Sequence, residues 1–381
     1  MSLVVFPFKD EEPAAVAANM AVAANHPDVD EVWAVASDDG PSFQRLRPIA
    51  SDLASSTGTA TGVHVQKHIG RFRPGKGDAM NTAIALAAEQ GRDRVHFYDA
   101  DITNFHESWI SGAEKAADHG YGVVRHRFPR ASTDAMITWF ITRPGLARLF
   151  PGTFLPRLNQ PLGGELLLIG DAVDRLAADT FVSDRSDWGI DTVITHAIST
   201  MDIGLYEHHV ADGKRHALYG SLDELRTMLV ECLDAVASLS GRNGPSPEAI
   251  HGSDPPAPVP PDLKQTVGYE IDGTINLLAQ NWTDEEVALA ETLPQTIAEP
   301  LLESRSTPTF SFMDSDLWFE TVRFLLDGFT LGEPAWESLA FRLWMTRVLA
   351  YTTSQALAGF DRAIDYLEGT IRDYDKLAGQ S

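Results

Sequence analysis

Apolar positions in the first 240 residues follow two spacings in turn. Short apolar runs rich in β-branched and aromatic residues predict buried strands, and between them apolar residues recur at helical spacing. Strands are expected at residues 3–6, 32–36, 63–66, 95–98, 121–126, 165–169 and 203–207. Helices are expected at residues 12–24, 42–55, 77–89, 107–118, 133–149, 189–199 and 222–239. This alternation predicts an α/β fold with right-handed crossovers, a mostly parallel sheet and helices on both faces.

A proline-rich stretch marks the clearest boundary in the chain. Seven prolines lie within residues 241–262, which predicts an extended connector without a packed element. Beyond it the pattern is mainly helical, with a capping box at Thr283–Glu286 and an apolar stripe from Trp336 to Val348. We therefore expect an α/β domain at 1–240, a linker at 241–262 and a C-terminal helical domain at 263–381, through which the protein forms a homo-oligomer.

Composition supports this division and limits the partners. A chain of 381 residues is long enough for two domains. Its net charge of −24 with seven lysines argues against nucleic acid or an anionic membrane as partner. The sequence contains no signal peptide pattern and no apolar run of about 18 residues, so we expect a cytoplasmic protein. An acidic, lysine-poor surface also suits a saline cytoplasm, which is a hypothesis that salt-independent stability and activity would contradict.

Two carboxylates, Asp99 and Asp101, follow the strand predicted at residues 95–98. Open α/β sheets bind ligands at the carboxyl ends of their strands. Residues two apart in an extended chain point to one face, so both carboxylates can face a single hard cation that holds a diphosphate. Aspartate is also common in turns and caps, so an ordinary loop remains the alternative for the pair taken alone.

Three cations, Arg71, Arg73 and Lys76, stand within six residues of an otherwise acidic chain. They predict a local basin for a phosphate or a carboxylate, with a plain cationic turn before a helix as the alternative. The segment nearly matches the phosphate-binding loop of nucleoside triphosphatases. We reject that motif because Gly77 replaces the hydroxyl residue that would meet magnesium, and Pro74 removes a backbone donor.

A second basic segment contains Arg125, His126, Arg127 and Arg130 and leads into hydroxyl residues. It is suited to clamp a small carboxylate, with Arg130 as the fork and Thr138 one helical turn beyond Asp134. A structural ion-pair network is the alternative.

Two further positions complete the candidate chemistry. Lys214 and Arg215 favour a neutral His216, the form that binds a metal, while Lys214 and Tyr219 can meet phosphate oxygens. A solvated loop histidine is the alternative. Asp191, at the start of the helix predicted at 189–199, is either a sugar ligand or a helix cap. The single cysteine, Cys232, lies within a helical pattern and is expected to be a small core residue.

Taken together, these segments resemble the GT-A class of nucleotide-sugar glycosyltransferases and, within it, the mannosylglycerate synthase family. The runs that carry the resemblance are 3–9, 73–78, 96–103, 129–139, 160–166, 186–192, 225–231, 310–314 and 344–351. They cover most of the chain, which makes them far more specific than an isolated Asp-x-Asp. The resemblance implies a GT-A sheet domain with a helical C-terminal domain. It also implies transfer of mannose from GDP-mannose to D-glycerate with retention of configuration, giving the compatible solute mannosylglycerate, with Mg²⁺ or Mn²⁺ as cofactor.

The same resemblance assigns roles to the candidate residues. It implies that Asp101 and His216 bind the metal, and that Lys76, Asp99 and Asp191 act in catalysis. The residues implied to bind the nucleotide-sugar are Pro7, Lys9, Glu11, Gln66, Lys76, Asp99, Ala100, Asp191 and Tyr219. Those implied to bind the acceptor are Arg130, Asp134, Thr138 and Leu162.

Two alternatives to this function remain. The same fold can use GDP-glucose as donor, or lactate or glycolate as acceptor, because one or two hydroxyl groups separate these substrates. A regulatory protein that binds a nucleotide-sugar without turnover is the other. Asp99, Asp101 and His216 with Lys76 disfavour it, since a binding module has little need of a metal at the leaving group.

Overall fold

The computed structural model describes residues 2–67, 69–216, 221–246, 249–255 and 258–380. The chain divides into two compact units, each assembled from separate stretches of sequence. The first comprises Met1–Pro129, Leu162–Ala217 and Asn243–Pro258, and the second comprises Arg130–Pro161, Leu218–Arg242 and Val259–Ser381. The units therefore cut the chain differently from the domain limits expected above, and those limits stay a prediction.

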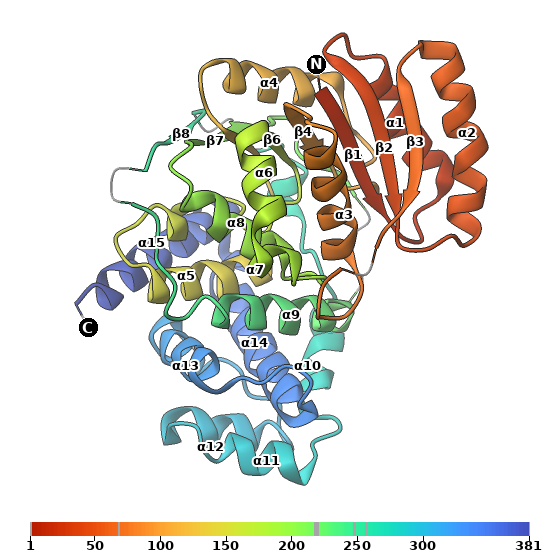
Figure 1. The fold of residues 1–381 in the computed structure, drawn as a ribbon. Coiled ribbons are helices and arrows are strands. Elements are labelled where there is room, and N and C mark those ends of the chain that lie inside the picture. The colour runs from red at the N-terminus through yellow and green to blue at the C-terminus, as the bar shows by residue number, and fades with distance from the viewer. Residues whose placement is uncertain (1, 68, 217–220, 247–248, 256–257, 381) are drawn as a thin grey trace. The chain divides into compact units, whose positions relative to one another are not determined.

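An eight-stranded sheet forms the centre of the first unit, in the order β3-β2-β1-β4-β6-β5-β7-β8 (Figure 1). Its strands are β1 (Ser2–Phe8), β2 (Val29–Ala36), β3 (Ala60–Val65), β4 (Arg94–Phe97), β5 (Val123–Arg127), β6 (Leu166–Ile169), β7 (Leu205–His209) and β8 (His251–Ser253). β6 runs antiparallel to β4 and β5, and the other neighbouring pairs among the described strands are parallel. The prediction of a mostly parallel sheet is confirmed.

Helices cover both faces of this sheet. They are α1 (Pro13–Ala24), α2 (Pro41–Thr57), α3 (Lys76–Glu89), α4 (Glu107–Asp118), α6 (Gly170–Ala178), α7 (Thr180–Ser183) and α8 (Ile190–Ser199). Val4 and Phe6 of β1 pack into one apolar core with residues of α1, α2 and α4. α3 lies across the sheet in front of β1 and β4 in Figure 1. Successive side chains of a strand point to opposite faces of the sheet, so each strand buries residues on both faces.

Three elements of the first unit differ from the prediction. α6 and α7 were not predicted, because α6 begins at Gly170 directly after β6 ends at Ile169, with no turn residues between them. β8 lies within the segment expected to be an unpacked connector, and its His251 pairs with Leu205 of β7. The residues of β8 are not prolines and keep their backbone donors, so a short edge strand forms between the prolines.

The second unit is helical, as predicted for the C-terminal part of the chain. Its elements are η1 (Thr138–Thr142, a π-helix), α5 (Arg143–Leu149), η2 (Leu155–Arg157), η3 (Leu222–Leu225), α9 (Arg226–Ala237), η4 (Leu263–Gln265), α10 (Ile271–Ala279), α11 (Asp284–Ala290), α12 (Gln295–Glu303), α13 (Ser315–Gly328), α14 (Pro334–Ser354), η5 (Ala356–Ala358) and α15 (Phe360–Ala378). Cys232 on α9 is buried, as expected. In the part of the chain that the structure describes, no helix has the length and apolar character that crossing a membrane requires.

The longest helix of this unit, α14, is buried on more than the predicted apolar stripe. Every residue from Leu339 to Thr352 is buried. Arg342 pairs with Glu286, and Arg347 donates to the carbonyl of Met313 at 3.1 Å. These arginines find partners inside the unit although they are buried, so the helix is buried beyond its apolar stripe.

The helix expected at residues 133–149 starts later. Ala135 has a φ of 55°, which turns the chain before the helical residues begin. Thr138 is then the first residue of the π-helix η1. Asp134 therefore stands in a turn before the helix and not within its first turn.

Candidate active site

The two aspartates lie in a turn after β4, and their carboxylates take different partners. β4 ends at Phe97. The turn is held by Asn19 of α1, whose Nδ2 donates to the carbonyl of Ala100 at 3.1 Å and of Ile102 at 2.8 Å. Asp99 faces Lys76 and Lys214, whereas Asp101 lies beside His216. The strand ends before both aspartates, so the extended chain expected here is not found, and whether both carboxylates face one cation stays a prediction.

Asp99 belongs to a group of five charged side chains, of which Glu165 and Asp191 are buried and the others partly buried. The group, here called the lysine–carboxylate cluster, comprises Lys76, Asp99, Glu165, Asp191 and Lys214. Lys76 Nζ lies 3.0 Å from Asp99 Oδ1 and 3.0 Å from Asp191 Oδ2. Lys214 Nζ lies 2.5 Å from Asp99 Oδ2 and 2.5 Å from Glu165 Oε1. Asp99 is therefore the central member, held by a lysine on each oxygen.

Burial and charge shift the pKa values of this cluster in opposite directions. Burial opposes the charged form of Lys76, but Asp191, Asp99 and Glu165 outweigh it and raise the pKa of Lys76. Burial also opposes the charged form of Asp99, yet Lys214 and Lys76 hold its pKa well below the usual value. Burial raises the pKa of Glu165 and that of Asp191. Keeping these last two carboxylates charged therefore costs free energy in the folded protein.

Two oxygens of the cluster are buried without a hydrogen-bond partner in the structure. They are Asp191 Oδ1 and Glu165 Oε2. Asp191 stands in the first turn of α8, but its Oδ2 accepts from Lys76 and its Oδ1 has no partner, so the side chain does not cap the helix. Buried acceptors are nearly always paired in native proteins, and an orphaned one marks a place where a ligand donor is expected.

Close backbone contact brings Lys76 to the cluster. A Cβ added at Gly77 would lie 2.3 Å from the carbonyl oxygen of Arg185, so only glycine lets the start of α3 approach this segment. The other two cations of the predicted basin point elsewhere. Arg71 Nε lies 3.2 Å from Asp184, and Arg73 donates to the carbonyl of Pro74 at 3.1 Å. The basin of three cations is therefore reduced to Lys76.

Asp101 and His216 form the candidate metal pair. His216 Nδ1 lies 4.0 Å from Asp101 Oδ2, and neither side chain is fully buried. A carboxylate and an imidazole at this separation fit a divalent cation placed between them. Among the residues that the structure describes, no three His, Cys, Asp or Glu side chains are grouped to hold a metal. A cation held by this pair would take its remaining ligands from water and substrate.

The loop that carries His216 is bound to the segment after the aspartates. The Thr103 amide donates to the carbonyl of Arg215 at 2.8 Å. The Arg215 amide donates to Asn104 Oδ1 at 2.8 Å, and Asn104 Nδ2 donates to the carbonyl of Gly213 at 2.9 Å. These hydrogen bonds join two parts of the chain more than a hundred residues apart.

The candidate nucleoside residues lie at the ends of neighbouring strands. Pro7 is in β1, and Gln66, just after β3, donates its amide to the carbonyl of Ala36 at 2.7 Å. Lys9 is exposed, and its amide donates to Glu11 Oε2 at 2.5 Å. Burial raises the pKa of Glu11, and the charges of Asp101 and Asp99 add to that effect.

Leu162 was predicted to bind the acceptor, and Tyr219 was predicted to bind the nucleotide-sugar. Leu162 is half-buried and lies two residues before Gly164. Tyr219 lies outside the described residues.

The candidate acceptor residues Arg130, Asp134 and Thr138 lie in the second unit. Arg130 pairs with Asp134 at 3.0 Å, and Thr138 is buried. In the first unit, Arg125 donates to Thr195 Oγ1 at 2.8 Å and to the carbonyl of Gly163, and Arg127 donates to the carbonyl of Asp254. Arg125 and Arg127 thus take part in the structural network that was the alternative for this segment, and an acceptor clamp through Arg130 stays a prediction.

Glu165 was missed as a site residue, and so were the ion pairs of Lys214 with Asp99 and Glu165. Glu165 precedes an apolar run, which predicts a strand but not its direction. Because β6 is antiparallel to β4, its start lies at the same edge as the end of β4. Gly164 was missed too: an added Cβ would lie 2.4 Å from Lys76 Nζ and 2.9 Å from Asp99 Oδ1. Lys214 was expected to meet phosphate, but it pairs with Asp99 and Glu165.

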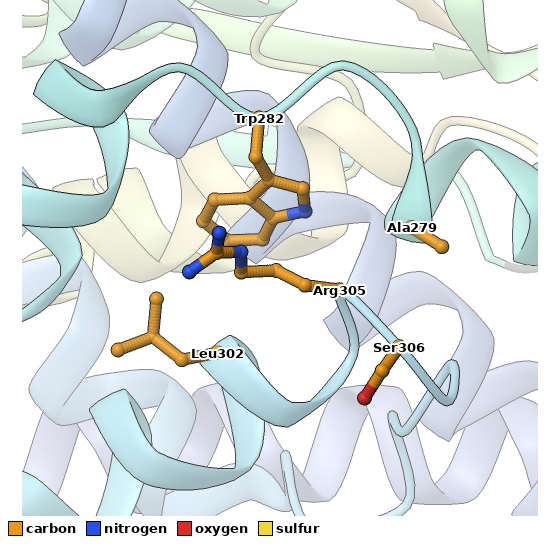
Figure 2. Close-up of a pocket in the computed structure, with 5 residues that line it drawn as sticks. All are labelled: Ala279, Trp282, Leu302, Arg305 and Ser306. Atoms are coloured by element: carbon orange, nitrogen blue, oxygen red, sulfur yellow. The ribbon is translucent and has the colours of Figure 1, made fainter.

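A pocket of about 490 Å³ in the second unit contains none of the candidate residues. It is lined by Ala279, Trp282, Leu302, Arg305 and Ser306 (Figure 2). The Trp282 ring also faces the Arg342 guanidinium, with 4.4 Å from its central carbon to the ring centroid.

The mostly parallel sheet gathers carboxylates and lysines at its strand ends, which fits an enzyme of the glycosyltransferase class. Comparison with known proteins agrees. A family model described as mannosylglycerate synthase, GT domain, matches residues 2–238. A second model, the mannosylglycerate synthase C-terminal domain, matches residues 263–371. The chain belongs to the mannosylglycerate synthase family, which confirms the resemblance seen in the sequence.

Two mannosylglycerate synthases are similar to this chain over nearly its whole length. The chain is 47% identical over 375 residues to the mannosylglycerate synthase of Rhodothermus marinus, covering 98% of this chain and 94% of that protein. It is 44% identical over 374 residues to that of Selaginella moellendorffii, covering 97% and 89%. Among solved structures, glucosyl-3-phosphoglycerate synthase from Mycobacterium tuberculosis in complex with Mn²⁺, UDP and glucosyl-3-phosphoglycerate matches with a TM-score of 0.48 and 20% identity, over 63% of this chain and 80% of that one.

Proposed function

We propose that this protein transfers a mannosyl group from GDP-mannose to D-glycerate, with retention of the anomeric configuration, and so makes mannosylglycerate. The observation that carries the proposal is the lysine–carboxylate cluster, with its two orphaned oxygens, at the strand ends that also present Asp101 and His216. Membership of the mannosylglycerate synthase family supports the reaction.

The donor is proposed to bind through its diphosphate, its nucleoside and its sugar. Lys76 has three ammonium donors, of which two point at carboxylates, so one remains for a phosphate oxygen. Asp191 Oδ1, buried without a partner, is suited to accept a hydrogen bond from a mannose hydroxyl. Asp99 binds the ribose or a metal-bound water. The other proposed donor contacts are Pro7, Lys9, Glu11, Gln66 and Ala100 for the nucleoside part and Tyr219 for the diphosphate.

The acceptor is proposed to bind through residues of matching charge. Arg130 and Thr138 hold the glycerate carboxylate, because a guanidinium forms paired hydrogen bonds with a carboxylate. Asp134 accepts hydrogen bonds from the glycerate hydroxyls. Leu162 lies beside the sugar and the acceptor.

A divalent cation, Mg²⁺ or Mn²⁺, held by Asp101 and His216 would neutralise negative charge as the diphosphate departs. Lys76 stabilises the same charge from a fixed position. Removing one such preorganised partner typically costs about 3–4 kcal/mol of transition-state stabilisation. With this charge balanced, the leaving group needs no acid catalyst.

Retention is proposed to occur by front-face attack. The acceptor oxygen forms its bond to the anomeric carbon on the face from which the phosphate oxygen departs, and that oxygen takes the acceptor's proton. The alternative is a double displacement through a carboxylate, as in retaining glycosidases. Trapping a mannosyl adduct on Asp191 or Glu165 would overturn the front-face proposal.

A matrix of donors and acceptors tests the substrates. GDP-mannose and GDP-glucose are each assayed with D-glycerate, lactate and glycolate, and the sugar product and released GDP are measured. We expect the fastest transfer from GDP-mannose to D-glycerate. Absence of that transfer would contradict the proposal, and binding of GDP-mannose without GDP release in any combination would favour the regulatory alternative.

The substitution Asp101→Ala tests the metal assignment. We expect metal-dependent turnover to be abolished, because one of two protein ligands is lost, while the circular dichroism spectrum and melting temperature stay those of the native protein. Turnover equal to the wild type would refute the assignment.

We also propose that the protein is cytoplasmic and forms a homo-oligomer through its C-terminal helical domain. Light scattering during size-exclusion chromatography tests the oligomeric state. A monomeric mass at micromolar concentration would contradict it.

A further inference from the structure

Lys214 joins three segments that are far apart in the sequence. Its Nζ contacts Asp99, which follows β4, and Glu165, which precedes β6, each at 2.5 Å. Only 9% of the Lys214 side chain is exposed. Two of its three ammonium donors therefore point at Asp99 and Glu165, which ties the loop that carries Lys214 to both segments.

Lys214 lies close in the sequence to His216, one residue of the candidate metal pair. Lys214 stands two residues before His216. The backbone of this loop is hydrogen-bonded to the Asn104 side chain and to the Thr103 amide. Lys214 is thus a second attachment of the same loop, made to the aspartate that lies two residues before Asp101. One ammonium group connects both segments that supply the proposed metal ligands.

We propose that Lys214 is a positioning residue that sets the affinity of the metal site by fixing the His216 loop against Asp99, with Glu165 as its anchor. This inference rests on the proposed function, because it requires Asp101 and His216 to bind the cation. Partners that orient metal ligands from behind commonly change metal affinity by about 10–100-fold when they are removed.

Glu165 is suited to the anchoring role because it does not move with the loop. It is fully buried at the start of β6, and β6 is paired on both sides by β4 and β5. A carboxylate fixed in the sheet gives the Lys214 ammonium a partner of constant position. Asp99 lies in a turn and would not by itself give the Lys214 ammonium a partner of constant position.

The test uses four variants of the full-length protein. Lys214→Met removes the charge and keeps most of the apolar stem, and Lys214→Arg keeps the charge and the donors. Asn104→Ala loosens the same loop without touching the cluster. Lys115→Met is the matched control, because Lys115 is an exposed lysine on α4.

The readout is Mn²⁺ affinity at saturating GDP, measured by calorimetry or by the paramagnetic resonance signal of free Mn²⁺. We expect Lys214→Met to bind Mn²⁺ about tenfold or more weakly, Lys214→Arg to recover most of that loss, Asn104→Ala to be weakened by about threefold, and Lys115→Met to match the wild type. Hydrogen exchange of amides 213–216 should be faster in Lys214→Met.

The outcomes separate this inference from the proposed function. If the wild type binds no Mn²⁺ with GDP, the proposed function fails and the inference fails with it. If the wild type binds Mn²⁺ and Lys214→Met binds it within twofold as tightly, only the inference is overturned. If Lys214→Met does not fold, a fifth variant, Lys214→Gln, decides, and a Mn²⁺ affinity within twofold of the wild type in that variant overturns the inference.

Discussion

β4 has a buried charged network at each end, and the two networks differ in how their oxygens are paired. At its start, Glu114 accepts hydrogen bonds from Ser2 and His96 on one oxygen and from Arg94 on the other. At its end, the lysine–carboxylate cluster leaves one oxygen of Asp191 and one of Glu165 buried without a partner. Both oxygens of Glu114 are paired within the protein, whereas the second network keeps two unpaired oxygens, which in the proposed function accept hydrogen bonds from a ligand.

The pKa values make the same distinction. Burial opposes the charged form of Glu114, but hydrogen bonds from His96, Ser2 and Arg94 lower its pKa to about 2. Burial instead raises the pKa of Asp191 and that of Glu165. The charge on Glu114 therefore stabilises the fold, and the charges on Asp191 and Glu165 are kept at a cost. Sites that bind ligands commonly sacrifice stability in this way.

The largest expected effect comes from Asp191→Asn, which separates function from stability at the second network. We expect the transfer rate to fall by about 100-fold or more, because a sugar contact and the Lys76 ion pair are changed together. The melting temperature should stay the same or rise, because a costly buried charge is removed. Steady-state kinetics and thermal unfolding measure the two effects.

Asp171→Asn is the matched control. Asp171 is the second residue of α6, as Asp191 is of α8, but its side chain is 61% exposed. Both activity and melting temperature should be unchanged. An Asp191→Asn variant with full activity would contradict the distinction between the networks.

Glu114→Gln should have the opposite profile at the first network. Loss of the charge removes about 3 kcal/mol from the free energy of unfolding, which corresponds to the lowered pKa. At about 2–4 °C per kcal/mol, the melting temperature should fall by about 6–12 °C. The turnover number at 25 °C should stay that of the wild type. Glu107→Gln, on the exposed side of the same helix, should change neither value, and a loss of turnover in Glu114→Gln would show that this network also serves the reaction.

A smaller effect is the pH dependence of that stability difference. The pKa of Glu114 is lower in the folded protein than its ordinary value of 4.5, so its contribution is fully present above pH 4.5 and lost as the pH falls toward 2. The difference in unfolding free energy between wild type and Glu114→Gln should shrink through this window. Urea unfolding at a series of pH values measures it, and a difference that stays constant from pH 7 to 3 would contradict the assignment.

The sequence predicted the local features of this molecule better than the long-range ones. β4 and the two aspartates after it were found because an apolar run followed by carboxylates is a local pattern. Glu165 was not assigned to the site because nothing local tells whether β6 runs parallel or antiparallel to β4. Lys214 was assigned to phosphate because its carboxylate partners are 115 and 49 residues away.

Helical patterns showed a similar limit. The apolar stripe of α14 was predicted, but the burial of a charged position was not: Arg342 is buried and pairs with Glu286 of α11. Periodicity reports which residues are polar, and a buried polar residue with a partner looks the same in sequence as one in water. Only the partner distinguishes them.

Calorimetric titration of GDP and of GDP-mannose, with Mn²⁺ present, tests the central claim that the carboxyl end of β4 holds the nucleotide-sugar. Glu114→Gln should bind both ligands within twofold of the wild type. Asp191→Asn should bind GDP nearly as the wild type does and GDP-mannose about tenfold more weakly, because its proposed contact is to the sugar. Equal affinity of wild type and Asp191→Asn for GDP-mannose, or equal weakening in both variants, would contradict the account.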